Sequence, residues 1–166
     1  MITAKDYINY YQLKPHPEGG YYKETYRAPG YISKEVLPTG FGGARNFSTA
    51  IYFLLLQNNF SAFHRIQSDE CWHFYAGGRL DIFIIHTTGQ LEIIHMGQNI
   101  IIGEKFQHVV PAGCWFASKP AEGSFYSFTG CTVAPGFDFE DFELADAASL
   151  IQLYPQHSAL IKHLTR

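Results

Sequence analysis

Charged side chains are scarce in this chain of 166 residues. Lysine and arginine number 12, aspartate and glutamate number 15, and charged residues make up 16% of the sequence, below the roughly 25% typical of soluble domains. With 46% hydrophobic residues, such a chain is expected to fold rather than to remain disordered. Its net charge of −3 provides no broad basic surface for phosphate groups, which speaks against a nucleic-acid partner.

Long apolar runs are also missing. The run from Ile51 to Leu56 is far shorter than the roughly 20 residues that a membrane helix requires. Residues 1–6 lack the basic stretch and the apolar core of a secretory signal. We therefore expect no membrane partner and a cytoplasmic location.

Cysteine is limited to Cys71, Cys114 and Cys131, and no two of them form a Cys-x-x-Cys pair. Three thiols cannot all pair within one chain, and disulfides are not expected without an export signal. We interpret them as buried, reduced thiols, because free cysteine is among the most buried residue types. A nucleophilic role remains an alternative for Cys71, which lies near His64 and His73 in the sequence.

Aromatic residues, by contrast, are abundant. Phe, Tyr and Trp make up 16% of the chain, and 15 glycines punctuate it. Aromatic side chains favour strands and glycines mark turns, so the composition predicts an all-β fold. Many short strands separated by turns are typical of a sandwich, jelly roll or barrel. The expected strands are 21–27, 48–56, 61–66, 71–75, 80–86, 91–95, 106–110, 114–117, 125–128 and 131–134.

Short helices are expected at both ends of the chain. Thr3 can cap a first helix, and the apolar spacing over 150–154 and 160–164 predicts helix near the C-terminus. Residues 28–45 look like a long loop, and loops of that length are usually functional or mobile. No domain boundary is apparent, so we expect one domain over residues 1–166.

The most informative stretch for function runs over residues 63–77. It places His64 on one expected strand and Glu70 just past the next turn, so the two side chains can face each other inside a sheet sandwich. A histidine and a carboxylate arranged in this way suit metal binding, or a base whose proton affinity is raised by its neighbour.

The spacing of His64, Ile66 and Glu70 ahead of Gly77 resembles the first motif of the cupin superfamily. The segment 111–116, Pro-Ala-Gly-x-x-Phe, resembles the second motif. Metal-dependent cupins have a further histidine in place of Ile66 and another in place of the phenylalanine that ends the second motif. Only two of the four usual ligands therefore remain, fewer than the three that catalytic zinc sites keep.

His73 is a candidate third ligand. Strand alternation puts His73 and Glu70 on opposite faces unless a bulge intervenes. We therefore expect no cofactor, and keep a divalent metal held by His64, Glu70 and His73 as the alternative.

The rest of the chain resembles one branch of this superfamily, the cupin-5 family, long catalogued as a domain of unknown function. The stretches that carry the resemblance are His16-Pro17-Glu18-Gly19-Gly20-Tyr21-Tyr22, Glu24-Thr25-Tyr26-Arg27, 49–55, Asp69-Glu70-x-Trp72-His73, Val110-Pro111-Ala112-Gly113-x-Trp115 and 131–139. The resemblance implies a jelly-roll barrel, usually a homodimer, with a pocket for a small-molecule ligand inside the barrel.

That branch is often compared with the RmlC-type sugar epimerases, which are cupins that work without metal and use a histidine base and a tyrosine acid. His64 matches the histidine, and Tyr126 is our choice for the acid, with Tyr22 as the alternative. The resemblance thus implies an epimerase or isomerase acting on a sugar-like or nucleotide-sugar-like substrate, with Glu70 polarising His64. A metal-dependent cupin enzyme and a non-catalytic small-molecule binder remain open.

Five further residues are candidates for substrate binding. Glu24 is an acid within an aromatic stripe, and Arg45 could bind an anionic substrate through two hydrogen bonds. Each has a structural alternative: an edge-strand charge for Glu24, a solvated arginine for Arg45, a core side chain for Trp72 and a structural hydrogen bond for His73. The full set of candidates is Tyr22, Glu24, Arg45, Trp72 and His73.

Overall fold

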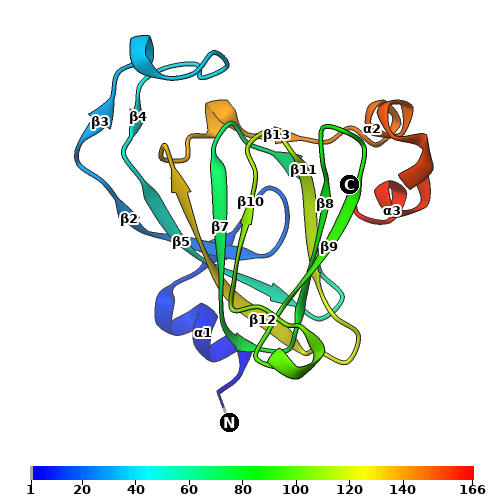
Figure 1. The fold of residues 1–166 in the computed structure, drawn as a ribbon. Coiled ribbons are helices and arrows are strands. Elements are labelled where there is room, and N and C mark those ends of the chain that lie inside the picture. Colours follow the sequence, from blue (N-terminus) through cyan, green and yellow to red (C-terminus); the bar gives the residue numbers. More distant parts are fainter. Residues whose placement is uncertain (1) are drawn as a thin grey trace.

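The computed structural model describes residues 2–166 and consists mainly of two antiparallel sheets that face each other (Figure 1). The first sheet has six strands, in the order β1 (Lys14–Pro15), β2 (Tyr21–Arg27), β5 (Thr49–Leu56), β12 (Tyr126–Ala134), β7 (Asp69–Gly77) and β10 (Gln107–Val110). The second has five, in the order β13 (Glu143–Leu144), β6 (Ser61–Arg65), β11 (Trp115–Pro120), β8 (Leu80–Ile85) and β9 (Leu91–Met96). The all-β jelly roll expected from the sequence is confirmed.

The remaining elements are short. Strands β3 (Tyr31–Ile32) and β4 (Arg45–Asn46) form a small separate sheet. The helices are α1 (Ala4–Tyr11), α2 (Ala147–Leu153) and α3 (Ser158–His163), with 3-10 turns η1 (Lys34–Val36), η2 (Ile100–Ile102), η3 (Phe139–Asp141) and η4 (Pro155–His157). Within residues 2–166, none of these helices is long and apolar enough to span a membrane.

Strand alternation separates the barrel interior from the outer faces. On β7, Glu70, Trp72 and Phe74 are buried, whereas His73 is only partly buried and Tyr75 is exposed. Side chains two residues apart point to the same face of a sheet. The inward side chains of both sheets pack into one apolar cluster that fills much of the barrel.

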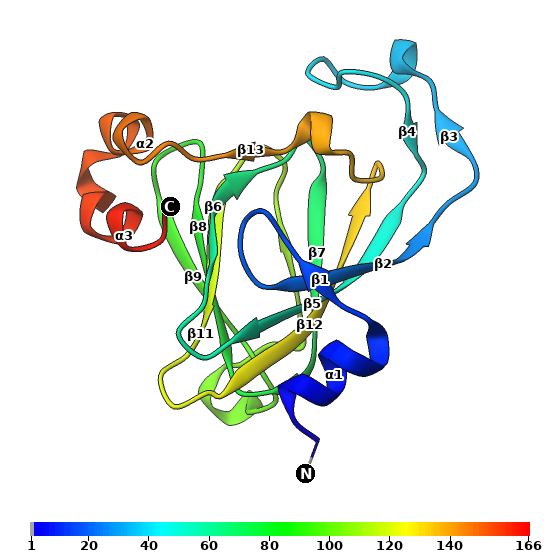
Figure 2. The ribbon, with the colours of Figure 1, turned by 180° about the vertical axis from the view of Figure 1, so that it is seen from behind.

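The helices cover the two outer faces (Figures 1 and 2). Helix α1 begins at a capping box in which Thr3 and Asp6 bond each other's backbone. Its Tyr7 stacks on Phe128 of β12, with ring centroids 4.4 Å apart. Helices α2 and α3 pack Leu150 and other apolar residues against the outer face of the five-stranded sheet. Both short helical regions expected at the chain ends are therefore present.

Two boundaries differ from those expected. Residues 125–128 and 131–134 were expected as two strands, but they belong to the single strand β12. Gly130 lies in the middle of β12. The residue is a glycine because the ring of Tyr75 lies directly over it and leaves no room for a Cβ. The glycine thus marks a close approach of a side chain and not a turn. The expected loop 28–45 also contains β3 and η1.

A buried ion pair fixes the segment that closes one end of the barrel. Arg45 of β4, whose side chain is 3% exposed, donates from Nε to Asp141 Oδ2 at 2.6 Å and from Nη2 to Asp141 Oδ1 at 2.7 Å. These hydrogen bonds raise the pKa of the Arg45 guanidinium. Asp141 ends η3, so the pair anchors Phe139 and Phe142 beside the barrel.

We expect Asp141→Asn to lower the free energy of unfolding by about 3 to 5 kcal/mol, because it removes the buried counter-ion of Arg45 and leaves only the exposed Glu140 beside it. Urea denaturation followed by circular dichroism measures this loss. Glu140→Gln is the matched control: Glu140 also bonds Arg45, but its side chain is 66% exposed, so we expect a loss below about 1 kcal/mol. Equal losses in both variants would contradict the assignment.

Candidate functional site

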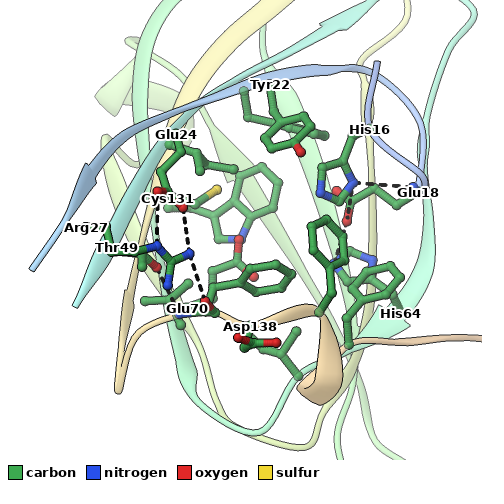
Figure 3. Close-up of a pocket in the computed structure, with 18 residues that line it drawn as sticks. His16, Glu18, Tyr22, Glu24, Arg27, Thr49, His64, Glu70, Cys131 and Asp138 are labelled. Atoms are coloured by element: carbon green, nitrogen blue, oxygen red, sulfur yellow. Dashed lines mark hydrogen bonds and ion pairs between the residues drawn. The ribbon is translucent and has the colours of Figure 1, made fainter. Parts of the chain in front are cut away.

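A cavity of about 360 Å³ lies inside the barrel, between the two sheets and the segment that contains η3 (Figure 3). Strands β2, β5, β6, β7 and β12 all contribute to its walls. Much of the lining is aromatic, including Tyr22, Phe53, Trp72, Phe137, Phe139 and Phe142. Its lining also includes several titratable side chains, among which His16, Glu18, His64 and Glu70 form a buried cluster.

The turn between β1 and β2 brings His16 and Glu18 to the cavity. His16 N donates to the Gly20 carbonyl and Gly19 N donates to the His16 carbonyl, both at 3.0 Å. Gly19 and Gly20 have φ of 113° and 76°, values that strongly favour glycine. A Cβ on Gly19 would overlap the carbonyl oxygen of Phe60. The paired glycines therefore hold this turn tightly against the barrel.

Glu18 lies at the centre of the polar cluster and is 6% exposed. Its Oε1 accepts from Ser61 Oγ at 2.8 Å. Its Oε2 lies 3.2 Å from His64 Nε2 and 3.3 Å from His16 Nδ1. Burial raises the pKa of Glu18, although His16 and the Ser61 hydrogen bond oppose the shift. The carboxyl group thus joins two imidazole rings that come from distant parts of the chain.

His64 is oriented by its own strand. Its Nδ1 lies 2.7 Å from the Ala62 carbonyl oxygen. A carbonyl oxygen can only accept, so Nδ1 carries the proton and the neutral ring has its lone pair on Nε2, next to Glu18. Burial lowers the pKa of His64, against the effect of Glu70 and of the Ala62 hydrogen bond. The ring packs on Phe116, with centroids 4.1 Å apart.

Glu70 is the second buried acid and is 8% exposed. Burial raises the pKa of Glu70 to about 7; His64 opposes this shift, Glu18 adds to it, and a hydrogen bond with the Cys131 thiol opposes it. Burial also raises the pKa of Cys131 well above its usual value, so this thiol stays protonated. Near neutral pH the cavity therefore holds a carboxyl group that can give up or take a proton.

His16 completes the cluster. The backbone N–H of Glu18 donates to His16 Nδ1 at 3.3 Å, and burial lowers the pKa of His16. Its ring lies edge-on to Tyr22, with centroids 4.5 Å apart. The site thus combines two neutral imidazoles and two buried carboxyl groups inside aromatic walls, which is an arrangement suited to moving protons.

Three proteins from other organisms are similar to this chain. The chain is 36% identical to the uncharacterised protein YML079W of Saccharomyces cerevisiae over 148 residues, which cover 84% of this chain and 73% of the yeast protein. The crystal structure of protein SO0799 from Shewanella oneidensis shares 38% identity, with a TM-score of 0.88, and covers 100% of this chain and 99% of its own. A hypothetical protein from Leishmania major shares 37% identity, with a TM-score of 0.89, covering 99% of both chains.

A family model described as "Cupin superfamily (DUF985)" matches residues 5–145. The chain belongs to the Cupin_5 family. Oxalate decarboxylase from Bacillus subtilis has a similar fold at 14% identity and a TM-score of 0.55, covering 90% of this chain and 36% of that one. This last likeness concerns the fold alone. The resemblance expected from the sequence motifs is confirmed.

The structure of this Cupin_5 protein brings five of the eight sequence-based site candidates to the cavity. They are Tyr22, Glu24, His64, Glu70 and Trp72. They come from β2, β6 and β7, so strands of both sheets meet at the site. His64 and Glu70 both line the cavity, as the motif spacing predicts, but the carboxyl group in contact with His64 Nε2 is that of Glu18, at 3.2 Å.

The other three candidates lie elsewhere. Tyr126 is on the outer face of β12, where its hydroxyl donates to the Ile2 carbonyl at 3.3 Å. Tyr126 and Phe128 are two residues apart and so point to the same face of β12, where Phe128 packs under helix α1. Cys131 points to the opposite face, into the barrel. The expected role of Tyr126 as the acid therefore has no geometric support, and Tyr22 is the tyrosine at the cavity.

Arg45 and His73 are also placed outside the cavity lining. Arg45 is occupied by Asp141 and Glu140, as described above. His73 lies on the outer face of β7, with its Nε2 3.0 Å from Thr132 Oγ1. The regular alternation of β7 separates it from Glu70. His73 therefore has the structural hydrogen bond named as its alternative, whereas Arg45 is not the solvated arginine named as its own, because its side chain is buried in the ion pair with Asp141.

Sequence reasoning missed His16 and Glu18 as site residues. In the sequence they belong to the stretch 16–22, which carries the family resemblance and forms a turn. One feature of the sequence could have identified them: two titratable side chains precede the Gly19-Gly20 pair, and such a pair predicts a tight turn that holds its neighbours in place.

The donor geometry does not fit a metal ion. Within residues 2–166, no group of three or more His, Cys, Asp or Glu side chains is arranged to hold one. The alternative metal set of His64, Glu70 and His73 is not brought together, because Glu70 faces the cavity from β7 whereas His73 lies on the outer face of the same strand. In the cavity, Glu18 Oε1 already accepts from Ser61, and its Oε2 lies within 3.3 Å of both imidazoles. We derive no chemical step through a metal in this Cupin_5 protein.

We expect tag-free protein purified without chelator to contain far less than one metal ion per chain by elemental analysis. Its midpoint of thermal unfolding should not change when a chelator is added. His64→Ala is the matched comparison, because His64 would be a ligand in any cupin-like site. Nearly one metal ion per wild-type chain, lost in this variant, would contradict the geometric assignment.

We also expect wild-type stability to fall relative to Glu70→Gln as pH rises. The pKa of Glu70 is raised by burial to about 7 in the folded protein, so the folded state binds the proton more tightly than the unfolded state. The stabilising contribution of the protonated Glu70 carboxyl group is complete below about pH 4.5 and is lost as pH rises through 7. The loss is on the order of 3 kcal/mol.

Urea denaturation of both proteins between pH 4.5 and 8.5 tests this. The stability difference should grow with pH up to about 8 and then level off. Glu122→Gln, at an exposed position on a turn, serves as the control and should show no such trend. A difference between wild type and Glu70→Gln that stays flat with pH would contradict the raised pKa.

Proposed function

We propose that this Cupin_5 protein is an epimerase-type or isomerase-type enzyme acting on a small sugar-like carbonyl compound bound inside the barrel. The observation that carries the proposal is the orientation of His64. Its Nδ1 is bonded to Ala62, which leaves the Nε2 lone pair beside Glu18 at the cavity. A neutral imidazole with a fixed lone pair is the form that a general base requires.

In the proposed reaction, His64 Nε2 removes a proton from the carbon next to the substrate carbonyl. The electron pair of that C–H bond forms a carbon–carbon double bond, and the carbonyl oxygen takes the negative charge. Glu70 supports this step as the acid that protonates the oxygen, because its pKa of about 7 leaves it partly protonated near neutral pH. Glu18, 3.2 Å from His64 Nε2, stabilises the imidazolium that forms.

Return of the proton decides the product. Return by His64 to the neighbouring carbon gives an isomer, whereas return by another group to the opposite face gives an epimer. Tyr22 is the candidate for the second case, since it lines the cavity from β2 in the sheet opposite to that of His64. The homodimer implied by the family resemblance stays a prediction.

The test is solvent proton exchange. We expect wild-type protein in D₂O to catalyse deuterium incorporation next to the carbonyl of at least one compound in a panel of free aldoses, free ketoses and nucleotide sugars, followed by proton NMR. His64→Ala should reduce the rate by roughly 10²- to 10⁴-fold, the usual contribution of a positioned proton-transfer group. Glu70→Gln should reduce it as well.

His73→Ala is the matched control, because it removes a histidine from the outer face of β7 and should leave the rate unchanged. Tyr22→Phe distinguishes the two products. If this variant still exchanges deuterium but no longer forms the epimer, Tyr22 is the group that returns the proton to the opposite face of the substrate carbon. Binding of a panel compound without any enzyme-dependent exchange would contradict the proposal and support a non-catalytic binding protein.

A further inference from the structure

The charges around the cavity are mostly carboxyl groups. Glu24 and Asp138 line it in addition to Glu18 and Glu70. Among the described residues that line it, Arg27 is the only lysine or arginine. A ligand with a phosphate or carboxylate group would therefore depend on Arg27 for its counter-charge.

Arg27 is already occupied by Glu24 (Figure 3). Its Nε donates to Glu24 Oε1 at 3.1 Å and its Nη2 donates to Glu24 Oε2 at 2.7 Å. Its Nη1 donates to Asn46 Oδ1 at 2.8 Å, and Nη2 also reaches the Phe137 carbonyl at 3.2 Å. A guanidinium has five N–H groups, so a single one remains for a ligand.

Among residues 2–166, the buried polar cluster supplies no cation to the cavity either. Burial lowers the pKa of both His16 and His64, so both rings are neutral near pH 7. An anion entering this space would lose its hydration without gaining a paired charge, which is strongly unfavourable. Hydroxyl groups, in contrast, can donate to the carboxyl oxygens and accept from Tyr22 without such a cost.

We infer that the cavity selects uncharged hydroxylated carbonyl compounds, such as free aldoses or ketoses, over phosphorylated or nucleotide-linked ones, and that Glu24 sets this selectivity by occupying Arg27. The carbonyl part of this assignment rests on the proposed function; the exclusion of anions rests on the charges alone. Glu24 is thus a specificity residue at the cavity, and it has no part in the proton transfer.

Inorganic phosphate is the probe for this inference, titrated at constant ionic strength and followed by isothermal titration calorimetry. We expect no saturable binding to wild-type protein at millimolar concentrations. Glu24→Gln keeps the side-chain shape but removes the charge that holds Arg27, so it should bind phosphate at least about tenfold more tightly. The double variant with Arg27→Gln should lose this gain, and Glu122→Gln should behave as wild type.

Two results would overturn the inference. The first is saturable phosphate binding by wild-type protein that Arg27→Gln abolishes, because Arg27 would then leave Glu24 for an anion. The second is a Glu24→Gln variant that gains no phosphate affinity. Neither measurement needs turnover, so the absence of deuterium exchange would contradict the proposed function and leave the anion result standing.

Discussion

The burial of the Glu18 carboxyl group between two histidines is the constraint on which the site depends. A carboxyl group in a 6% exposed position needs hydrogen-bond partners, because burial without them costs several kcal/mol. Ser61 supplies one hydrogen bond to Oε1, and the rings of His64 and His16 lie 3.2 Å and 3.3 Å from Oε2. This requirement explains why the turn before β2 contains two glycines with positive φ and lies so close to Phe60.

The same burial sets the proton affinities of the whole cluster. The imidazoles are kept neutral and the carboxyl groups are pushed toward their protonated forms, since the aromatic walls stabilise no net charge. The walls depend in turn on the Arg45–Asp141 ion pair, which anchors Phe139 and Phe142 over the polar groups. A structural ion pair outside the cavity lining thereby helps to keep water away from His64 and so supports its low proton affinity.

The fold and half of the polar cluster could be predicted from the sequence, because His64 and Glu70 lie within one short motif whose strands are consecutive. The contact of Glu18 with His64 could not be predicted, since it arises only where the β1–β2 turn packs against β6 in the tertiary structure. Tyr126 was misplaced for a related reason. If residues 125–128 and 131–134 form two separate strands, the alternation of side chains in one strand does not determine the face of the other. Because β12 is continuous, the inward position of Cys131 places Tyr126 on the outer face.

The choice of a carboxyl group at position 70 bears on whether the cavity only binds or also catalyses. Holding this carboxyl in a buried site makes the folded state less stable at neutral pH, because the pKa of Glu70 is raised to about 7. A glutamine would offer hydrogen bonds to a ligand without that penalty. A binding protein has no need for a group that exchanges its proton near pH 7, whereas a proton-transfer enzyme does. The energetic cost of Glu70 therefore favours catalysis over binding alone.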